Sequence, residues 1–368
     1  MSKHRLVALL AASSLCGWLA CARASSLAPT ASPVAVKTGP TAAPTHAILP
    51  PAATSVPVAR EVVRVGHTHG LAGPLQIAMV RGYFEEQGVD LRREEFGSTA
   101  DAILPLSTGA LDVGSTTPNA SFFNALARGV RIYLALAGSH VEPGTGGFPL
   151  VVRRGPDGPV VASVADLRGR RVGQNQRGAI NEWALERMLA GESLRLEDVE
   201  VVIMPFPDVL AGFGGGSVDA AILPDPLGTI AEERGLATRL LDADEYVAGA
   251  QVAAMSFSEQ FARHEATARR WAVAYLCGVR DYMDAMEFGR DREAILAILG
   301  QASGFDPRLL QRAGYFPMRR DGRVNGEAIQ SMLDWLVQRG YVPHKPDIAP
   351  LLDHRYADYA AHVLSKTN

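Results

Sequence analysis

Residues 61–96 read EVVRVGHTHGLAGPLQIAMVRGYFEEQGVDLRREEF. The β-branched run 62–65 is followed by a glycine-punctuated turn and then by residues 74–87, whose apolar side chains recur at helical spacing. Gly88 stops that helix, and the alternation in 89–96 predicts a second strand. This order of strand, helix and strand is the unit from which parallel sheets covered by helices are built.

A second copy of the unit follows later in the chain. A helix at 101–108 and a strand at 111–115 complete the first copy as βαβαβ. The helix-to-strand joint reads TGALDV at 108–113 and returns in similar form as GSVDA at 216–220. The second copy is predicted as strands at 171–173, 199–206 and 218–223, with helices at 179–190 and 209–213.

The repetition predicts an α/β protein with two similar lobes. Parallel strands present their carboxyl ends along one edge of each sheet, so two facing edges form a ligand cleft. After a strand-like stretch at 251–257 the chain is mainly helical, and we expect this tail to cover the first lobe. Lobe I then comprises 61–150 and 256–368 and lobe II comprises 151–255, with hinge crossings at 150–152 and 251–255.

Composition narrows the class of partner. The 368 residues contain 36 Lys+Arg and 39 Asp+Glu, for a net charge of -3 and no long basic run, which argues against nucleic acid. Two of the three cysteines, Cys16 and Cys21, lie in the N-terminal segment and leave Cys277 alone in the globular part. We therefore expect no disulfide framework, no metal site and no cofactor.

The N-terminus reads as an export signal. Residues 1–21 have a short basic start, an apolar run and small residues, and WLAC at 18–21 resembles a lipobox that would acylate Cys21. The alternative is cleavage after Ala24, which gives a free protein starting at Ser25. Residues 22–60 are rich in Pro, Ala and Thr without acidic or aromatic residues, which predicts a disordered tether. No later run approaches the roughly 20 apolar residues that a membrane span requires.

Polar residues that follow the strands of the first lobe are candidate ligand contacts. Loops after parallel strands place such donors and acceptors at one wall of the cleft. The alternative is that they are turn and capping residues, with Ser98 or Thr99 starting one helix and Asn119 the next. The candidates in this lobe are His67, His69, Ser98, Thr99, Thr116, Thr117 and Asn119.

The second lobe offers a candidate cation and a candidate anion. Arg177 lies with Asn175 and Gly178 in the loop before a helix, where it can contact a carboxylate or sulfonate or remain a solvated arginine. Asp225 stands between two prolines after a strand, where it can accept from an amine or cap the following helix. Phe148 and Phe206 can stack on an aromatic ligand or fill the core; Asp208 completes the candidate set.

Four motifs carry a family resemblance: GYFEEQGV at 82–89, LSTGALDV at 106–113, ADLRGRRVG at 165–173 and VDAAILPDP at 218–226. In this order and spacing, residues 62–355 resemble the periplasmic binding proteins of the nitrate, sulfonate, taurine and thiamine-precursor type, the SsuA/THI5-like group. The resemblance implies a two-lobed type II fold, with each lobe a mainly parallel sheet. It also implies an ABC permease with its ATPase as partner, and cleft roles for Thr116, Thr117 and Asp225.

The function that follows is extracytoplasmic capture, by a monomer, of a small organic solute that is sulfonate- or taurine-like, a pyrimidine or vitamin-like. Two alternatives stay open at this point: a ligand-sensing module for a membrane receptor, and a pyrimidine-precursor enzyme of the same fold. The enzymes that the resemblance includes use a cysteine-rich loop, which this chain lacks. As a hypothesis, the ligand is zwitterionic or heteroaromatic, with its anionic end near Arg177 and its donor end near Asp225.

Overall fold

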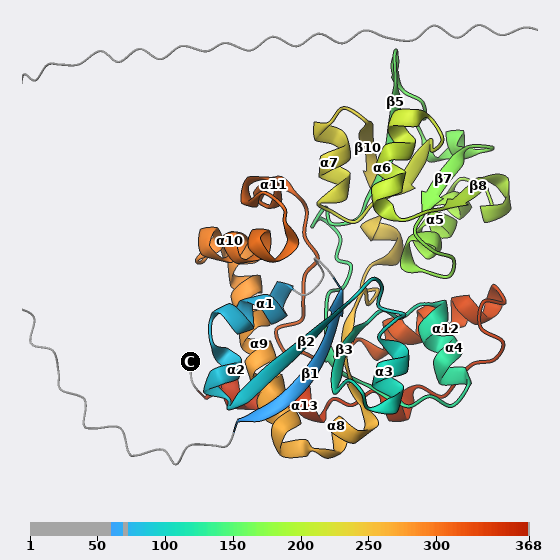
Figure 1. The fold of residues 1–368 in the computed structure, drawn as a ribbon. Helices are drawn as coiled ribbons and strands as arrows, with labels where there is room; N and C mark the ends of the chain where they lie inside the picture. Colours follow the sequence, from blue (N-terminus) through green and yellow to red (C-terminus); the bar gives the residue numbers. More distant parts are fainter. Residues whose placement is uncertain (1–59, 69–72, 367–368) are drawn as a thin grey trace, which may run out of the picture. The chain divides into compact units, whose positions relative to one another are not determined.

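Two β-sheets organise the part of the chain that the computed structural model describes, residues 60–68 and 73–366 (Figure 1). The expectations for the export signal, for acylation of Cys21, for the tether through residue 59 and for His69 concern positions outside the described residues. The first sheet belongs to lobe I and has the strand order β2-β1-β3-β11-β4. Its strands are β1 Glu61–Thr68, β2 Val89–Phe96, β3 Val113–Thr116, β4 Ile132–Ala137 and β11 Ala254–Ser258.

The second sheet belongs to lobe II and repeats the topology of the first. Read from β8, its order is β8-β7-β9-β5-β10, which corresponds strand by strand to β2-β1-β3-β11-β4. A short additional strand, β6, pairs with β5. The strands are β5 Pro149–Gly155, β6 Gly158–Pro159, β7 Arg171–Gln174, β8 Glu200–Ile203, β9 Ala220–Ile222 and β10 Ala237–Asp242.

Each sheet contains one reversed strand. In both lobes this is the strand that directly follows a crossing from the other lobe. β5 runs antiparallel to β9 and β10, and β11 runs antiparallel to β3 and β4. The chain therefore crosses between the lobes in residues 138–148 and again in 248–253. The first crossing ends just before the one expected at 150–152, and the second overlaps the one expected at 251–255. Gln251 ties the two crossings together, because its Nε2 donates to the carbonyl oxygens of Ser139 and Ala253 at 3.0 and 2.7 Å.

The recurring joint in the sequence has a structural counterpart, which we call the strand clasp. In lobe I, Arg64 donates to both carboxylate oxygens of Asp112 and to the carbonyl of Gly109. In lobe II, Arg171 makes the same three contacts with Asp219 and Gly216. The backbone contacts also correspond, because the N–H of Arg64 donates to Asp112 and the N–H of Arg171 donates to Asp219.

The clasp explains why glycine recurs at the joint. Gly109 and Gly216 end their helices with φ of 73° and 70°, a left-handed conformation that L residues rarely adopt. That turn leaves the glycine carbonyl facing the arginine and places the aspartate at the start of the next strand. The repeat is therefore a device that joins two neighbouring parallel strands through one ion pair.

Helices cover both sheets, with the boundary differences expected of a pattern-based prediction. Residues 74–87 form two helices instead of one, because Gly82 takes φ of 79° and ends the first. The strand predicted at 199–206 ends at Ile203, so Phe206 is the first residue of a helix. In lobe I the helices that precede the tail are α1 Gly73–Val80, α2 Tyr83–Glu86, α3 Ile103–Thr108 and α4 Ala120–Ala127. Lobe II contains α5 Ile180–Gly191, α6 Phe206–Gly215 and α7 Leu227–Glu233, with short 3-10 turns at Val164–Leu167, Leu196–Asp198 and Ala243–Val247.

The C-terminal tail packs on lobe I and also contacts lobe II. Trp271 in the long helix α9 is fully buried beneath the lobe I sheet, as is Tyr356 in α13. α12, however, places Trp335 against Trp183 of α5, and Arg339 just after it pairs with Glu197 at 2.9 Å. The tail helices are α8 Glu259–Arg263, α9 Glu265–Phe288, α10 Arg292–Ser303, α11 Pro307–Arg312, α12 Gly326–Gln338 and α13 Arg355–Ser365, with a 3-10 turn at Ala349–Leu351.

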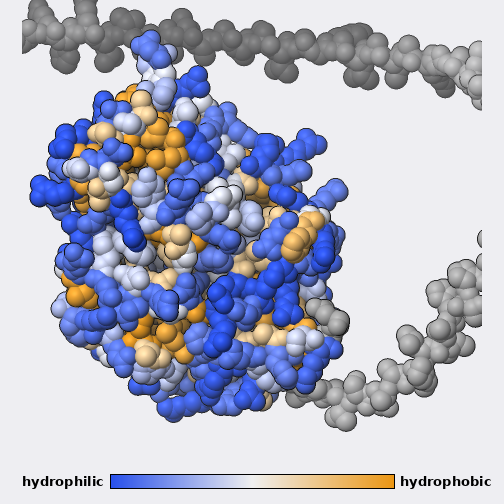
Figure 2. Space-filling model, turned by 180° about the vertical axis from the view of Figure 1, so that it is seen from behind, coloured by the Kyte–Doolittle hydropathy of each residue, from blue (hydrophilic) through white to orange (hydrophobic). Residues whose placement is uncertain are grey.

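The surface is mainly polar. Figure 2 shows charged and polar residues over most of one face, with apolar residues in separate patches. Large apolar side chains that are exposed, such as Val80, Leu104 and Phe288, come from different helices. Among residues 60–68 and 73–366, no helix combines the length and apolar character that crossing a bilayer demands.

Candidate functional site

A cavity of about 600 Å³ lies where lobe I meets the loop after β9 of lobe II. Lobe I contributes His67 from the end of β1 and Ser139 from the first crossing, while lobe II contributes Asp225 between its two prolines. The volume is within the range of small-molecule sites. The remaining lining residues come from α1, β2, α9, α10, α11, the loop between α10 and α11, and the segment 314–318.

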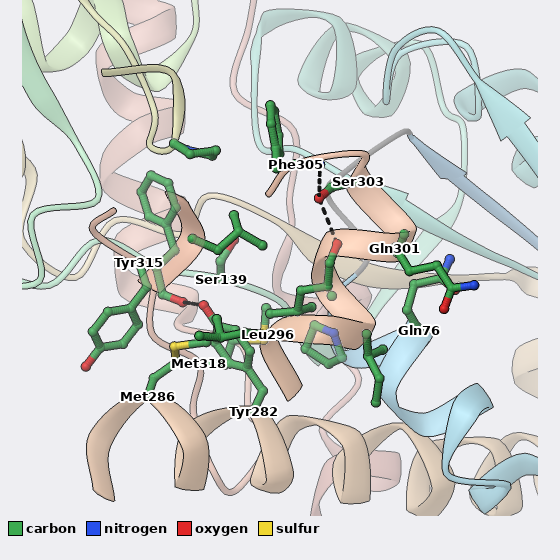
Figure 3. A pocket seen from close by; sticks show the side chains of 18 of the residues that line it. Gln76, Ser139, Tyr282, Met286, Leu296, Gln301, Ser303, Phe305, Tyr315 and Met318 are labelled. Carbon is green, nitrogen blue, oxygen red and sulfur yellow. Dashed lines mark hydrogen bonds between the residues drawn. The ribbon is translucent and has the colours of Figure 1, made fainter. Parts of the chain in front are cut away.

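The wall formed by the tail helices is strongly apolar (Figure 3). Tyr282 and Met286 face the cavity from the end of α9, and Leu296 faces it from α10. Tyr315 and Met318 close the same side, and the hydroxyl of Tyr282 is occupied by the carbonyl of Phe316 at 3.2 Å. Methionine adapts its shape to the group it contacts, so this wall can accommodate apolar groups of different outline.

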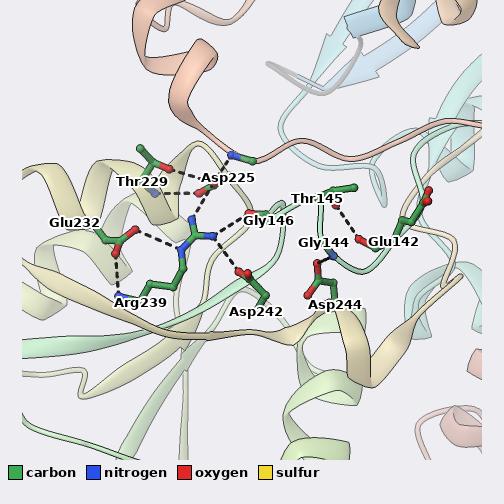
Figure 4. A network of polar contacts seen from close by, with 11 residues as sticks. Glu142, Gly144, Thr145, Gly146, Asp225, Thr229, Glu232, Arg239, Asp242 and Asp244 are labelled. Carbon is green, nitrogen blue, oxygen red and sulfur yellow. Dashed lines mark hydrogen bonds and ion pairs between the residues drawn. The ribbon is translucent and has the colours of Figure 1, made fainter. Parts of the chain in front are cut away.

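Asp225 lies at the cavity but its carboxylate is fully engaged with protein groups (Figure 4). The side chain is 0% exposed. It accepts from the backbone N–H and hydroxyl of Thr229, from Arg239 at 3.2 Å and from the N–H of Gly314 at 2.7 Å. The expected alternative, a contact that holds the start of α7, is therefore present, and the carboxylate also joins lobe II to the tail.

The segment 313–318 forms a third connection between the lobes, which we call the strap. Gly314 approaches Gly146 so closely that a Cβ would lie 2.0 Å from the Gly146 carbonyl oxygen. The N–H of Tyr315 donates to the carbonyl of Thr145, and Arg312 at the end of α11 pairs with Glu233 of α7. The strap thus docks along the first crossing and covers one side of the cavity.

Arg177 does not line the cavity and has a protein partner. Its guanidinium pairs at 2.9 Å with Glu182, whose side chain is 0% exposed. Glu182 also accepts from the N–H of Gly178 at 2.7 Å and from the hydroxyl of Tyr341 at 3.1 Å. Asn175, in the same loop, is half-buried, with an Oδ1 that has no hydrogen-bond partner among the described residues.

The loop after β7 in lobe II contacts the start of α4 in lobe I. The N–H of Ala120 donates to the carbonyl of Gly178 at 3.0 Å, which joins the start of α4 in lobe I to lobe II. Gly178 has φ of 62°, and a Cβ there would lie 2.6 Å from the Cβ of Ala120. Asn119 caps α4 through the N–H of Phe122 at 3.0 Å, which is the structural role that the sequence left open.

The remaining polar candidates of lobe I make hydrogen bonds within that lobe. The hydroxyls of Thr99 and Thr117 lie 3.2 Å apart. Thr116 is buried, with its hydroxyl 2.6 Å from that of Ser256 in β11. Ser98 is exposed and bonds to Asp101 in the turn before α3. None of these four predicted residues lines the described cavity.

The aromatic candidates and Asp208 also lie outside the cavity lining. Phe148 is 2% exposed and packs edge-on against Phe316, so it belongs to the core. Phe206 packs against the apolar cluster beneath α6, and Asp208 is exposed in the first turn of that helix. Among the predicted residues that the structure describes, His67 and Asp225 are therefore the two at the cavity.

Two features of the structure were not predicted from the sequence: the apolar wall of the cavity, and a buried amide outside the cavity lining. The tail contributes most of the apolar wall, although no local pattern says against which lobe a tail helix packs. Gln174 at the end of β7 is fully buried, and neither atom of its amide has a hydrogen-bond partner in the described part of the chain. A polar residue that ends an apolar strand was a usable signal for a buried amide.

Cys277, the cysteine in the described part of the chain, lies outside the cavity lining. Burial raises the pKa of the Cys277 thiol to about 11, with Asp281 adding to the shift, so the thiol is protonated at neutral pH. A nucleophilic cysteine requires the opposite shift. No group of three or more His, Cys, Asp or Glu side chains within residues 60–68 and 73–366 is arranged to hold a metal ion.

Two sheets of one topology, each completed by a reversed strand and joined by crossings beside a cavity, define the two-lobed periplasmic binding protein fold. A family model described as NMT1/THI5 like matches residues 72–285, more than half of the chain. The chain belongs to the NMT1/THI5-like family.

Individual relatives agree with this class. A chain of Escherichia coli K12 that is named as an aliphatic sulfonates-binding protein is 26% identical over 300 residues, 78% of this chain and 87% of its own length. A chain of Brucella abortus that is named as a binding protein is 27% identical over 173 residues. That match covers 46% of this chain and 50% of the Brucella protein, so this chain spans about half the length of that relative.

Solved structures share the fold at low sequence identity. The sulphonate-binding protein SsuA of Escherichia coli has a TM-score of 0.65 at 22% identity, covering 80% of this chain and 92% of its own. The nitrate-binding protein NrtA of Synechocystis has a TM-score of 0.63 at 14% identity, covering 82% and 89%. The desulfurization enzyme DszB has a TM-score of 0.61 at 15% identity, covering 84% and 100%. The fold thus serves both binding proteins and an enzyme.

Proposed function

We propose that this chain is the extracytoplasmic solute-binding component of an ABC importer. It holds a small organic solute in the cavity between its lobes and delivers it to a membrane permease that is driven by an ATPase. The observation that carries the proposal is the position of the cavity: His67 and Ser139 face it from lobe I and Asp225 borders it from lobe II. A solute there contacts both lobes, so its binding free energy can favour one interlobe arrangement.

The chemistry at the cavity supports capture over turnover. Asp225 is saturated by four hydrogen bonds. Cys277 lies outside the cavity lining, and its thiol is protonated at neutral pH. The DszB likeness shows that the fold can hold an enzyme, but this site offers no activated nucleophile among its described residues. Binding followed by release is therefore the function that these residues support best.

A thermal-shift screen against small organic solutes tests the proposal. A solute at 100 times its Kd is expected to stabilise the protein by about 2.7 kcal/mol, which raises Tm by several degrees. Ser139→Trp is expected to abolish the shift, because its side chain would occupy the cavity that Ser139 faces. Ser331→Trp, an exposed position on α12, is the matched control and should retain the shift. A solute that stabilises wild type and Ser139→Trp equally would bind elsewhere and would contradict the proposal.

The same proposal includes a lipid anchor. Acylation of Cys21 in WLAC would tether the protein to the outer face of the membrane through residues 22–60. Mass spectrometry of the mature protein from its native membrane is expected to find an N-terminal diacylated or triacylated Cys21, and Cys21→Ser should move the protein to the soluble fraction. A mature chain that starts with an unmodified Ser25 would rule out the anchor.

A further inference from the structure

The walls of the cavity differ in chemistry. Lobe II contributes Pro224, Asp225 and Pro226. The carboxylate of Asp225 is buried and already paired with Arg239. Lobe I contributes apolar side chains from the tail, including two methionines, two tyrosines, two leucines and a phenylalanine. They come from α9, α10, α11, the loop between α10 and α11, and the strap. Those residues are Tyr282, Met286, Leu299, Phe305, Leu310, Tyr315 and Met318.

The polar side chains of α1, α10 and β2 in the lining, Gln76, Gln301, Arg93 and Glu95, come from a different part of the cavity wall. In Figure 3 the carboxamides of Gln76 and Gln301 extend on one side of the cavity, while Met286 and Tyr315 lie on the opposite side with Leu296 between them. Arg93 lines the cavity beside Gln76, to which it donates at 3.4 Å. α1 packs against α10, so these carboxamides come from neighbouring elements.

The two ionic anchors expected from the sequence are not available in this arrangement. Arg177 is paired with the buried Glu182 and does not line the cavity. Asp225 borders it with no exposed side-chain surface. The other charged side chains among the described lining residues are Arg93 and Glu95 of β2, and the lining as a whole offers a ligand more apolar than polar surface.

Resting on the proposed function, we propose that the solute is an amphiphile with a medium-length acyl or alkyl portion. The apolar portion lies against α10, α11 and the strap, and a polar end that accepts hydrogen bonds, such as a carboxylate or an amide, meets Gln76, Gln301 and Arg93. Each methylene that becomes buried against apolar side chains is expected to raise the affinity about fourfold. A small polar solute would leave this wall in contact with water.

Titration calorimetry with n-alkanoates and n-alkanamides of four, six and eight carbons tests the inference on the mature chain. Wild type is expected to bind at least one series with affinity that rises about fourfold per methylene, or about 16-fold per two carbons. Leu299→Gln and Leu310→Gln, which place an amide in the apolar wall at half-buried positions, are expected to flatten that dependence. The control Leu104→Gln alters a leucine that is 70% exposed on α3, outside the lining, and should leave the dependence unchanged.

Leu299→Ala, which shortens the same side chain without adding a polar group, provides a second variant and should weaken every chain length longer than four carbons. Affinity that does not change with chain length in either series would overturn the inference. So would a solute from the thermal-shift screen that binds wild type, Leu299→Gln and Leu310→Gln equally, although that result leaves the proposed function intact. A protein that binds no compound in the screen or in either series overturns the proposed function, and the inference with it.

Discussion

The Asp219→Asn protein is expected to lose about 3 kcal/mol of its free energy of unfolding at neutral pH. Asp219 is 4% exposed and accepts hydrogen bonds from Arg171 and from Arg153. The amide removes the negative charge and leaves two guanidinium groups without their partner. Both arginines keep some contact with water, at 36% and 22% side-chain exposure, which is why the expected loss is at the low end for a broken buried pair.

The pH dependence of this loss has a definite sign. Burial alone would raise the pKa of Asp219, but hydrogen bonds from Arg171 and Arg153 outweigh it and hold the pKa below its ordinary value. A carboxyl whose pKa is lowered by folding stabilises the native state above its ordinary pKa, near 4, and loses that contribution as pH falls through the folded value. The difference between wild type and Asp219→Asn, measured by urea unfolding, should therefore be constant from pH 7 to 5 and shrink below about 4.

The clasp of lobe I supplies the matched control. Among the described residues, Arg64 is the one arginine that pairs with Asp112, whereas Asp219 pairs with two. Asp112→Asn weakens the corresponding contacts with Arg64, but the Asp112 side chain is more exposed, at 14% against 6% for Asp219. We expect it to cost about 1–2 kcal/mol. Equal losses in the two variants, or a larger loss at Asp112, would show that burial does not set the strength of the clasp.

The Gly278→Ala protein is expected to be less stable by about 2 kcal/mol and to bind solute more weakly. Gly278 lies in α9, where alanine alone would stabilise the helix by about 1 kcal/mol. A Cβ at this position, however, would lie 2.2 Å from the carbonyl oxygen of Pro74 and 3.0 Å from the backbone N of Ala78. Backbone atoms cannot rotate away, so α1 and α9 must separate, and overpacking of this kind outweighs the gain in helix propensity.

The loss of binding follows because α1 also lines the cavity. Gln76 and Met79 of that helix face the site, so moving α1 moves part of the wall. Gly191→Ala, at the end of α5, is the control, because no atom lies within 4 Å of the Cβ it would add. It should be neutral or slightly stabilising in urea unfolding. A Gly278→Ala protein as stable as wild type would mean that the contact between α1 and α9 yields easily.

The repeat in the sequence predicted two lobes of similar structure. The clasps show that the repeated residues join neighbouring parallel strands in each lobe. The joints at 108–113 and 216–220 were recognisable as similar, but their arginine partners were not, because each lies 48 residues upstream inside a strand. The equal spacing of 48 in both lobes was the available signal. Local patterns locate helices and strands, whereas an ion pair between distant positions requires the fold.

The candidate site was predictable in part for the same reason. Placing polar residues after strands located His67 and Asp225, which do border the cavity. The Asp225 carboxylate accepts hydrogen bonds from Arg239 and Gly314, which lie 14 and 89 residues further along the chain, so its local sequence does not reveal that it is already bonded. The apolar wall depends on which way α10 and α11 turn, and amphipathic periodicity gives the face that a helix buries but not the partner that covers it.

The position of the clasps bears on how such a protein acquires a new ligand. The aspartates of the clasps directly precede β3 and β9, at the amino ends of these strands. The cavity, in contrast, adjoins the carboxyl ends of β1, β2 and β9. Substitutions in the loops of one end therefore leave the anchorage at the other end untouched. Ligand specificity can therefore change by substitution in the loops while the contacts that hold the strands together are kept. This separation is consistent with a fold that this chain shares with proteins named for sulphonate and for nitrate, at 22% and 14% identity to it.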